Sequence, residues 1–351
     1  MSESIVRYDL DHFAESPMGN VASIDESVNF IQIAHGKHAG EGQNFIRICA
    51  KARELRPLME ECVSDGWFLY KSSPDLSTLV RADFVPRFWH RITSGEFSVD
   101  EAGTIYTLSV DSSDRRARAL IVVFSSMAET FDDASLSRFF YQNFRSLGKH
   151  LDSGFAVLRI ADMDGVVGGF YAPTRFAPDR IARVESLIAS TAESLGVESD
   201  RVILYGASKG GSGALLYGLS SRVGWKCVAV DPVVDDVYYE SAYNDSHWTA
   251  GNIFLHRKVD LYGSLADGLL EDDSAPRFAV VTSRRSPLFS QISKLAQRMP
   301  VEATAFFVSP DPSISQHSEV CPKTMRLAAG IMNVWANGMD LRPSWIDSER
   351  D

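Results

Sequence analysis

The sequence predicts an α/β fold in which a mostly parallel sheet is flanked by helices and preceded by a smaller accessory region. Two observations favour this class. From about residue 101 onward, short runs of β-branched and aromatic residues alternate with longer segments of helical periodicity, the pattern of a parallel sheet covered on both faces. One strand-to-helix junction, Gly206-Ala-Ser-Lys-Gly210, also has the glycine spacing of a sharp catalytic turn.

The chain divides near residue 100 into an accessory or lid region, residues 1–100, and a catalytic domain, residues 101–351. In the second part, strands are predicted over residues 103–110, 119–124, 155–160, 201–205, 226–230, 277–282 and 302–308. Helices are predicted over residues 135–147, 179–195, 210–221, 287–298 and 323–338. The first part has a helix-like stretch, 44–64, and a strand-like run, 67–70, but no recognisable fold.

The bulk composition is that of a globular chain. At 351 residues, with 45% hydrophobic and 23% charged residues, the chain does not belong to the disordered, collagen-like or coiled-coil classes. The net charge is −11 with scattered acidic residues, which argues against a nucleic-acid partner because no basic surface offsets the repulsion. No apolar run approaches the ~20 residues that cross a bilayer, so no membrane span is expected.

The N-terminus and the cysteines indicate a cytoplasmic protein. No basic segment followed by an apolar stretch opens the chain, so no secretory signal is predicted. The cysteines are Cys49, Cys62, Cys227 and Cys321. Their wide spacing disfavours a zinc site and a disulfide framework. His35 and His38 lack a nearby carboxylate or cysteine, so no metal site is predicted. The sequence has no signal for the oligomeric state.

The junction around Ser208 is the most informative segment. A predicted strand precedes it and a helical pattern follows, as the G-x-S-x-G nucleophile elbow of α/β-hydrolases requires. Small neighbours are needed because such a turn strains the serine backbone and leaves little room for a Cβ. We therefore expect Ser208 to be a nucleophile and the Lys209 amide to be an oxyanion donor at the helix N-terminus, with the Lys209 side chain pointing outward.

The alternative for this junction is the glycine-rich turn of a dinucleotide-binding fold. The spacing of Gly206, Gly210, Gly211 and Gly213 does not match G-x-G-x-x-G, and no acidic residue follows at the expected distance of about 20 residues. Asp231 does end the next predicted strand, slightly further along, so this alternative stays open. The hydrolase interpretation is favoured, and it requires no cofactor.

The base and the acid of a triad follow the serine along the chain in this fold. His317, the last histidine, lies in the loop after the final predicted strand, where it can act as general base. The commonest place for the acid, Ser283-Arg-Arg-Ser-Pro, has no carboxylate, so Asp231 is preferred. A serine–histidine pair without an acid is also possible. The other candidates for the acid are Asp235, Asp236, Asp273 and Glu319.

Two further loops at the same edge of the predicted sheet could contact substrate. The loop after strand 119–124 offers the amides of Ser126 and Met127 as second oxyanion donors. The loop after strand 155–160 carries Asp162 and Asp164, which are candidates for binding sugar hydroxyls or a divalent ion. Acidic turn residues more often hydrogen-bond their own backbone, so a structural role is the alternative for this pair.

Three segments, taken in order, resemble a known family. They are Leu158-Arg-Ile-Ala-Asp-Met-Asp-Gly, Ile203-Leu-Tyr-Gly-Ala-Ser-Lys-Gly-Gly and Cys227-Val-Ala-Val-Asp-Pro-Val-Val. Over residues 115–240 the chain resembles the bacterial capsular polysaccharide biosynthesis family of the XcbB/CpsF type. The resemblance implies an α/β-hydrolase-like protein from a cell-surface glycan locus. The chain is also distantly similar to accessory secretion proteins that acetylate glycans on exported adhesins with a serine triad.

These features together predict a serine-dependent acyl hydrolase or acyltransferase with an acyl-enzyme intermediate. A small-molecule ester or thioester, or a cell-surface glycan or its precursor, is the expected substrate. Whether water or a sugar hydroxyl accepts the acyl group depends on the shape of the pocket. The main alternative is a catalytically inactive glycan-binding or assembly protein of the same fold. A weaker one is a nucleotide-sugar-binding enzyme, which nucleotides would stabilise against heat.

Overall fold

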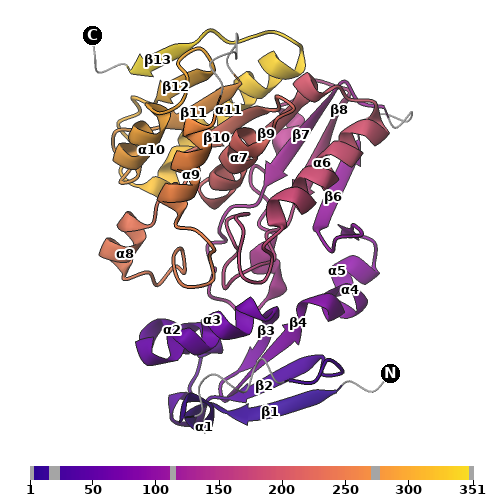
Figure 1. Ribbon diagram of the computed structural model, residues 1–351, viewed down its shortest axis with the longest axis vertical. Coiled ribbons are helices and arrows are strands. Elements are labelled where there is room, and N and C mark those ends of the chain that lie inside the picture. Colours follow the sequence, from indigo (N-terminus) through magenta and orange to yellow (C-terminus); the bar gives the residue numbers. More distant parts are fainter. Residues whose placement is uncertain (1–3, 16–23, 111–115, 270–276, 348–351) are drawn as a thin grey trace.

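The predicted fold class is confirmed by a computed structural model, which describes residues 4–15, 24–110, 116–269 and 277–347. Figure 1 shows a large sheet flanked by helices, with a smaller sheet formed by the N-terminal part of the chain. The strand order of the large sheet is β13-β12-β11-β10-β9-β7-β8-β6-β5. From β13 to β8 all neighbouring strands are parallel, and β6 and β5 extend the sheet antiparallel.

Every predicted strand of the second part is present in this sheet. The whole sheet consists of β5 (Ser98–Val99), β6 (Ile105–Val110), β7 (Ala119–Phe124), β8 (Phe155–Ile160), β9 (Val202–Ala207), β10 (Lys226–Val230), β11 (Phe278–Thr282), β12 (Thr304–Val308) and β13 (Ser344–Asp347). The short β5 and the C-terminal β13 were not predicted. Both lie at the edges of the sheet, where partial exposure weakens the apolar signal in the sequence.

Helices cover both faces of the large sheet. One face packs against α6 (Arg180–Leu195), α7 (Lys209–Ser220), α9 (Lys258–Asp267) and α10 (Phe289–Ala296), and the other packs against α11 (His317–Ala336). In β7, Leu120 and Val122 point into the first core, whereas Ile121 and Val123 point into the second. This burial on both sides explains why the central strands are continuous apolar runs. A short helix, α8 (Val237–Tyr243), follows β10.

The first part of the chain folds into a four-stranded sheet of order β1-β2-β4-β3. Its elements are β1 (Ile5–Asp9), α1 (Leu10–Glu15), β2 (Phe30–Ala34), α2 (Phe45–Lys51), α3 (Arg56–Ser64), β3 (Trp67–Ser73), β4 (Leu76–Arg81), α4 (Val85–Phe88) and α5 (His90–Thr93). In Figure 1, α2 and α3 lie on the side of this sheet that faces the large one. Met59 of α3 shares a core with Val167 and Trp248, so the accessory region packs directly onto the rest of the chain.

Three predicted helices differ from the structure. The stretch 44–64 breaks at Ala52, whose extended backbone (φ −91°, ψ 91°) ends α2 before α3 begins. In place of the helix predicted over residues 135–147, the chain has 3-10 turns at Leu136–Phe139 and Leu147–Lys149, and Phe144 between them has φ 51°, which a helix does not accommodate. The last helix begins at His317 instead of residue 323. No helix in the described ranges is both long and apolar enough to cross a bilayer.

Candidate active site

The segment around Ser208 forms a sharp turn from β9 into α7. The strand ends at Ala207, the helix begins at Lys209, and Ser208 between them has φ 54° and ψ −124°. Non-glycine residues rarely adopt this conformation, which costs on the order of 1–3 kcal/mol and persists only where the surroundings enforce it. Here the Ser208 N–H donates to Val230 O at 2.9 Å, which ties the turn to the end of β10.

Two glycines make room for this turn. A Cβ on Gly206 would overlap the carbonyl group of Gly210, and a Cβ on Gly210 would overlap the carbonyl oxygen of Phe124 in β7. The obstructing atoms belong to the backbone, so no side-chain rotation can relieve either overlap. The two glycines of the G-x-S-x-G pattern are therefore required by close approach between β9, β7 and the first turn of α7.

We expect Gly210→Ala to lower the free energy of unfolding by at least roughly 3 kcal/mol, at the upper end of the cost of overpacking a core. Gly330→Ala is the matched control, because in α11 no atom beyond the helix's own backbone lies within 4 Å of the place its methyl group would take. That change should be neutral or stabilise the helix by about 0.5–1 kcal/mol. Denaturant titration of both variants measures the difference, and equal stability would contradict the steric argument.

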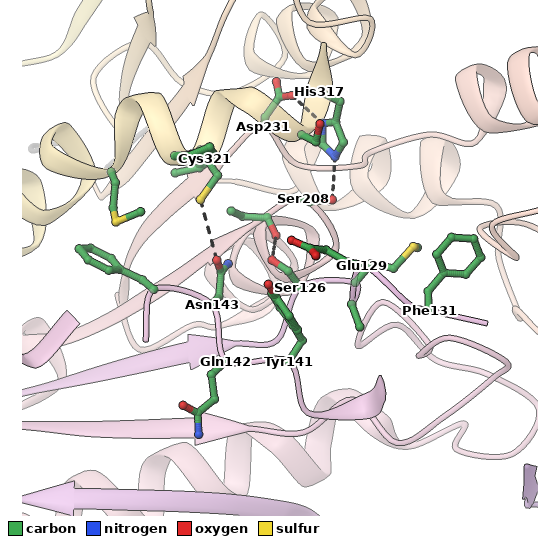
Figure 2. Close-up of a pocket in the computed structure, with 18 of the residues that line it drawn as sticks. Ser126, Glu129, Phe131, Tyr141, Gln142, Asn143, Ser208, Asp231, His317 and Cys321 are labelled. Carbon is green, nitrogen blue, oxygen red and sulfur yellow. Dashed lines mark hydrogen bonds and ion pairs between the residues drawn. The ribbon is translucent and has the colours of Figure 1, made fainter. Parts of the chain in front are cut away.

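The structure brings Ser208, His317 and Asp231 into one hydrogen-bonded chain (Figure 2). His317 Nε2 lies 2.7 Å from Ser208 Oγ, and His317 Nδ1 lies 2.7 Å from Asp231 Oδ2. Because an ionised carboxylate only accepts hydrogen bonds, Nδ1 donates to Asp231, and the lone pair of Nε2 accepts from the serine hydroxyl. The side chains come from three elements that are far apart in sequence: the elbow, the end of β10 and the first turn of α11.

Asp231 is held by more than the histidine. Its side chain is buried, Thr282 Oγ1 donates to Oδ1 at 2.6 Å, and Ser286 Oγ donates to Oδ2 at 2.7 Å. The loop after β11, which lacks a carboxylate, thus supplies a hydroxyl donor to the aspartate. Sequence reasoning missed Thr282 and Ser286. The only signal for them is that hydroxyl residues stand where an acid was expected.

The other candidates for the acid have different partners. Asp236 pairs with Lys258 at 2.9 Å, and Asp235 accepts from the Val237 N–H. Glu319 accepts from the backbone and hydroxyl of Ser315. Asp273 lies outside the described residues.

Two of the three residues predicted to supply oxyanion donors line the cavity beside the serine. Ser126 and Met127 line the same cavity as Ser208, and Ser126 Oγ donates to Ala207 O at 2.6 Å, which fixes this loop against the elbow. The Lys209 N–H is the first of α7 and has no intrahelical acceptor. An oxygen bound to an acyl carbon on Ser208 would therefore lie near backbone donors at a helix N-terminus.

The prediction that the Lys209 side chain points outward is wrong. The side chain is fully buried, and its Nζ lies 2.9 Å from Asp162 Oδ2 and 3.2 Å from Val167 O. The first turn of α7 is covered by the loop after β8, so a lysine there has no path to solvent. Its charge is instead balanced by the aspartate of that loop.

Asp162 and Asp164 do not line the cavity, so the expectation that they bind substrate or a cation is corrected. Both are buried. Asp164 pairs with Arg180 at 2.9 Å and accepts from Thr174 Oγ1. Burial raises the pKa of Asp164, while the Arg180 guanidinium opposes the shift. Asp162 pairs with Lys209 of α7 and Asp164 pairs with Arg180 of α6, so both ion pairs hold the loop after β8 against these helices.

Ser208 and His317 open into a cavity of about 1040 Å³. Part of its lining is a cluster of aromatic side chains, which is called the aromatic wall below. The aromatic wall consists of Phe131, Tyr238, Tyr239, Tyr243 and His247. The rest of the lining includes Asn143, Phe144, Arg145, Lys149, Cys321 and Met325. In Figure 2, Phe131 lies on one side of Ser208, and Asn143 and Cys321 lie on the other.

The aromatic wall is packed as a unit. The ring of His247 stacks on Phe131 with centroids 4.8 Å apart, and Tyr243 meets it edge-on at 4.4 Å. Tyr239 lies edge-on to His317 at 6.4 Å, and burial raises its pKa, so its phenol stays neutral. None of these residues stood out in the sequence, because aromatic residues are more often core than binding surface.

The accessory region contacts the segments that carry this wall. Arg47 of α2 forms an ion pair with Asp132 at 2.9 Å, directly after Phe131 in the chain. Arg56 of α3 donates to Asn244 O at 3.0 Å, next to the end of α8. Helices α2 and α3 thus contact the two segments that carry the aromatic side chains of the cavity.

No family model matches this chain, and no curated protein matches it by sequence. Several solved structures are similar at low identity. They include the capsule O-acetyltransferase of Neisseria meningitidis serogroup A (15% identity, 66% of this chain and 92% of that chain, TM-score 0.48). They also include a fluorophosphonate-binding serine hydrolase of Staphylococcus aureus (13%, 68% and 96%, TM-score 0.45). A glycosylation-associated protein complex from Streptococcus agalactiae is similar too (13%, TM-score 0.41), and the match spans 67% of this chain but only 45% of that one.

Proposed function

We propose that this chain is a serine-dependent acyl hydrolase or acyltransferase that forms an acyl-enzyme on Ser208. The observation that carries the proposal is the hydrogen-bond chain from Ser208 through His317 to Asp231, 2.7 Å at each link, which opens into a cavity. A serine hydroxyl is a weak nucleophile until an adjacent base removes its proton, and a third group must orient that base. The strained elbow supports the same role, because strain of this kind gathers at functional sites.

In the proposed reaction, Ser208 Oγ attacks the carbonyl carbon of an ester or thioester and its proton passes to His317 Nε2. The π electrons of the carbonyl move onto oxygen, which the amides of Lys209 and of Ser126 or Met127 stabilise. The tetrahedral intermediate then expels the alcohol or thiol, which takes the proton from His317. Water or a second hydroxyl next gives its proton to His317 and attacks the acyl-enzyme, and Ser208 recovers its proton as the product leaves.

We further propose that the substrate is a sugar ester, either an O-acylated glycan or its precursor. The cavity is larger than a short acyl chain needs, and its volume is at the upper end of the ~300–1,000 Å³ of small-molecule sites. The apolar C–H faces of a hexose can pack on the rings of the aromatic wall. Both the volume and the rings support a substrate whose alcohol part is bulky and partly apolar.

The proposal is tested by mass spectrometry after incubation with a fluorophosphonate probe. Wild-type protein should carry one adduct, on Ser208, and the Ser208→Ala and His317→Ala variants should lose it. An O-acetylated hexose should slow labelling more than ethyl acetate does at the same concentration. Absence of an adduct on folded wild-type protein would rule out the activated serine and favour a non-catalytic glycan-binding protein.

A further inference from the structure

The side-chain amide of Asn143 is a second polar group in the lining of the cavity. The side chain of Asn143 is 6% exposed, lines the cavity, and its Nδ2 has no hydrogen-bond partner in the described part of the chain. Buried amide groups are nearly always paired in folded proteins, and an unpaired one needs an explanation. Because the residue lines the cavity, a substrate atom held beside this amide would give Nδ2 the partner that it lacks.

Hydrogen bonds from Arg159 fix the backbone of Asn143. Arg159 of β8 donates to the carbonyl oxygens of Asn143 at 2.8 Å and Phe144 at 3.2 Å. These bonds hold Phe144 in its left-handed conformation (φ 51°), and its ring packs on Tyr205 with centroids 6.1 Å apart. The loop is therefore built to present Asn143 in one position, as a binding site on a rigid support requires.

The amide orientation is fixed as well. Cys321 Sγ lies 3.8 Å from Asn143 Oδ1 and donates to it, and the Tyr205 hydroxyl lies 3.9 Å from the same sulfur. Burial raises the pKa of Cys321 and of Tyr205, so both keep their protons at neutral pH. With Oδ1 engaged by the thiol, Nδ2 remains as the free donor. Figure 2 shows Asn143 between Cys321 and Ser126, whereas Gln142 extends away from the serine.

We propose that Asn143 is a specificity-determining residue, which donates from Nδ2 to a neutral oxygen of the substrate close to the ester that Ser208 attacks. This proposal rests on the proposed function of Ser208. A carbonyl, ether or hydroxyl oxygen fits, because the amide is an uncharged donor. A substrate with a methylene at that place leaves Nδ2 unpaired, and sites built around a hydrogen bond reject such analogues.

Matched pairs of esters test this role. 4-Nitrophenyl methoxyacetate and 4-nitrophenyl butyrate differ by an oxygen in place of a methylene in the acyl part. 2-Methoxyethyl acetate and butyl acetate differ in the same way in the alcohol part. After division by the rates of hydroxide-catalysed hydrolysis, wild-type kcat/KM should favour the oxygen-bearing ester of at least one pair by about tenfold, the effect of one uncharged hydrogen bond.

The preference should disappear in Asn143→Ala and remain in Gln142→Ala, which alters a neighbouring cavity residue that points elsewhere. Asn143→Asp keeps the acceptor for Cys321 but removes the donor, so it should disfavour the oxygen-bearing ester even if the alanine variant folds poorly. A fluorophosphonate adduct on each variant shows that Ser208 is intact. Labelled variants with wild-type preferences in both pairs would overturn the role of Asn143 alone, whereas an unlabelled wild type would overturn the proposed function itself.

Discussion

Asp231→Asn should lower kcat/KM for an ester substrate by about four orders of magnitude. The carboxylate of Asp231 orients His317 and places a negative charge beside the imidazolium that forms when Ser208 loses its proton. Asparagine carries no such charge. If its oxygen stays on Thr282 Oγ1, its amide nitrogen faces His317 Nδ1 and forces the imidazole proton onto Nε2. In that tautomer Nε2, the atom that faces Ser208, has no lone pair with which to accept the serine proton.

The control for this variant is Glu319→Gln. Glu319 lies two residues from His317 but accepts from Ser315, so kcat/KM should stay at the wild-type value. Steady-state kinetics and the rate of fluorophosphonate labelling measure both variants, and circular dichroism checks that each is folded. A large loss in Glu319→Gln with little loss in Asp231→Asn would show that another carboxylate serves the histidine.

The large sheet could be predicted because burial on both faces leaves a direct mark on the sequence. A strand such as β7 is apolar at every position, since it must satisfy a core on each side. The elbow was recognisable for a related reason, because only glycine fits where Gly206 and Gly210 approach other backbone segments. In both cases a local constraint decides the residue type, and a local pattern therefore reveals it.

The accessory sheet could not be predicted because its pairing is not local. β1 pairs in parallel with β2, and β2 pairs with β4 across α2, α3 and β3. The failed helix over residues 135–147 has a similar cause. Its apolar residues have helical spacing. However, Arg159 of β8 donates to the carbonyl oxygens of Asn143 and Phe144 and stabilises the left-handed backbone conformation of Phe144. Contacts between distant segments outweighed the local preference.

The same distinction applies to the candidate site. Ser208, His317 and Asp231 each follow a predicted strand at the same edge of the sheet, so chain order was sufficient to bring them together. Chain order did not predict which side chains hydrogen-bond to these three residues. Thr282 and Ser286, which donate to Asp231, lie more than fifty positions from it in the sequence. Nothing in their own segment indicates that these hydroxyls donate to a carboxylate.

Loss of the buried Lys209–Asp162 ion pair should strongly destabilise the fold. Lys209→Met should lower the free energy of unfolding by roughly 3–5 kcal/mol, because it leaves the fully buried carboxylate of Asp162 without its counter-charge. Among the described residues, the other hydrogen-bond donor to Asp162 is the Tyr171 N–H at 3.3 Å, which is too weak to replace a cation. Methionine has nearly the length of lysine, so lost packing contributes little.

Asp162→Asn, alone and combined with Lys209→Met, completes the cycle. Each single change leaves one uncompensated buried charge, whereas the double change removes both, so the double variant should be more stable than Lys209→Met. Denaturant titration and thermal melting measure the three variants. The side chain of Lys209 has no access to the cavity. An unchanged melting temperature with a raised KM in Lys209→Met would therefore contradict this account and indicate that the lysine side chain contacts the substrate.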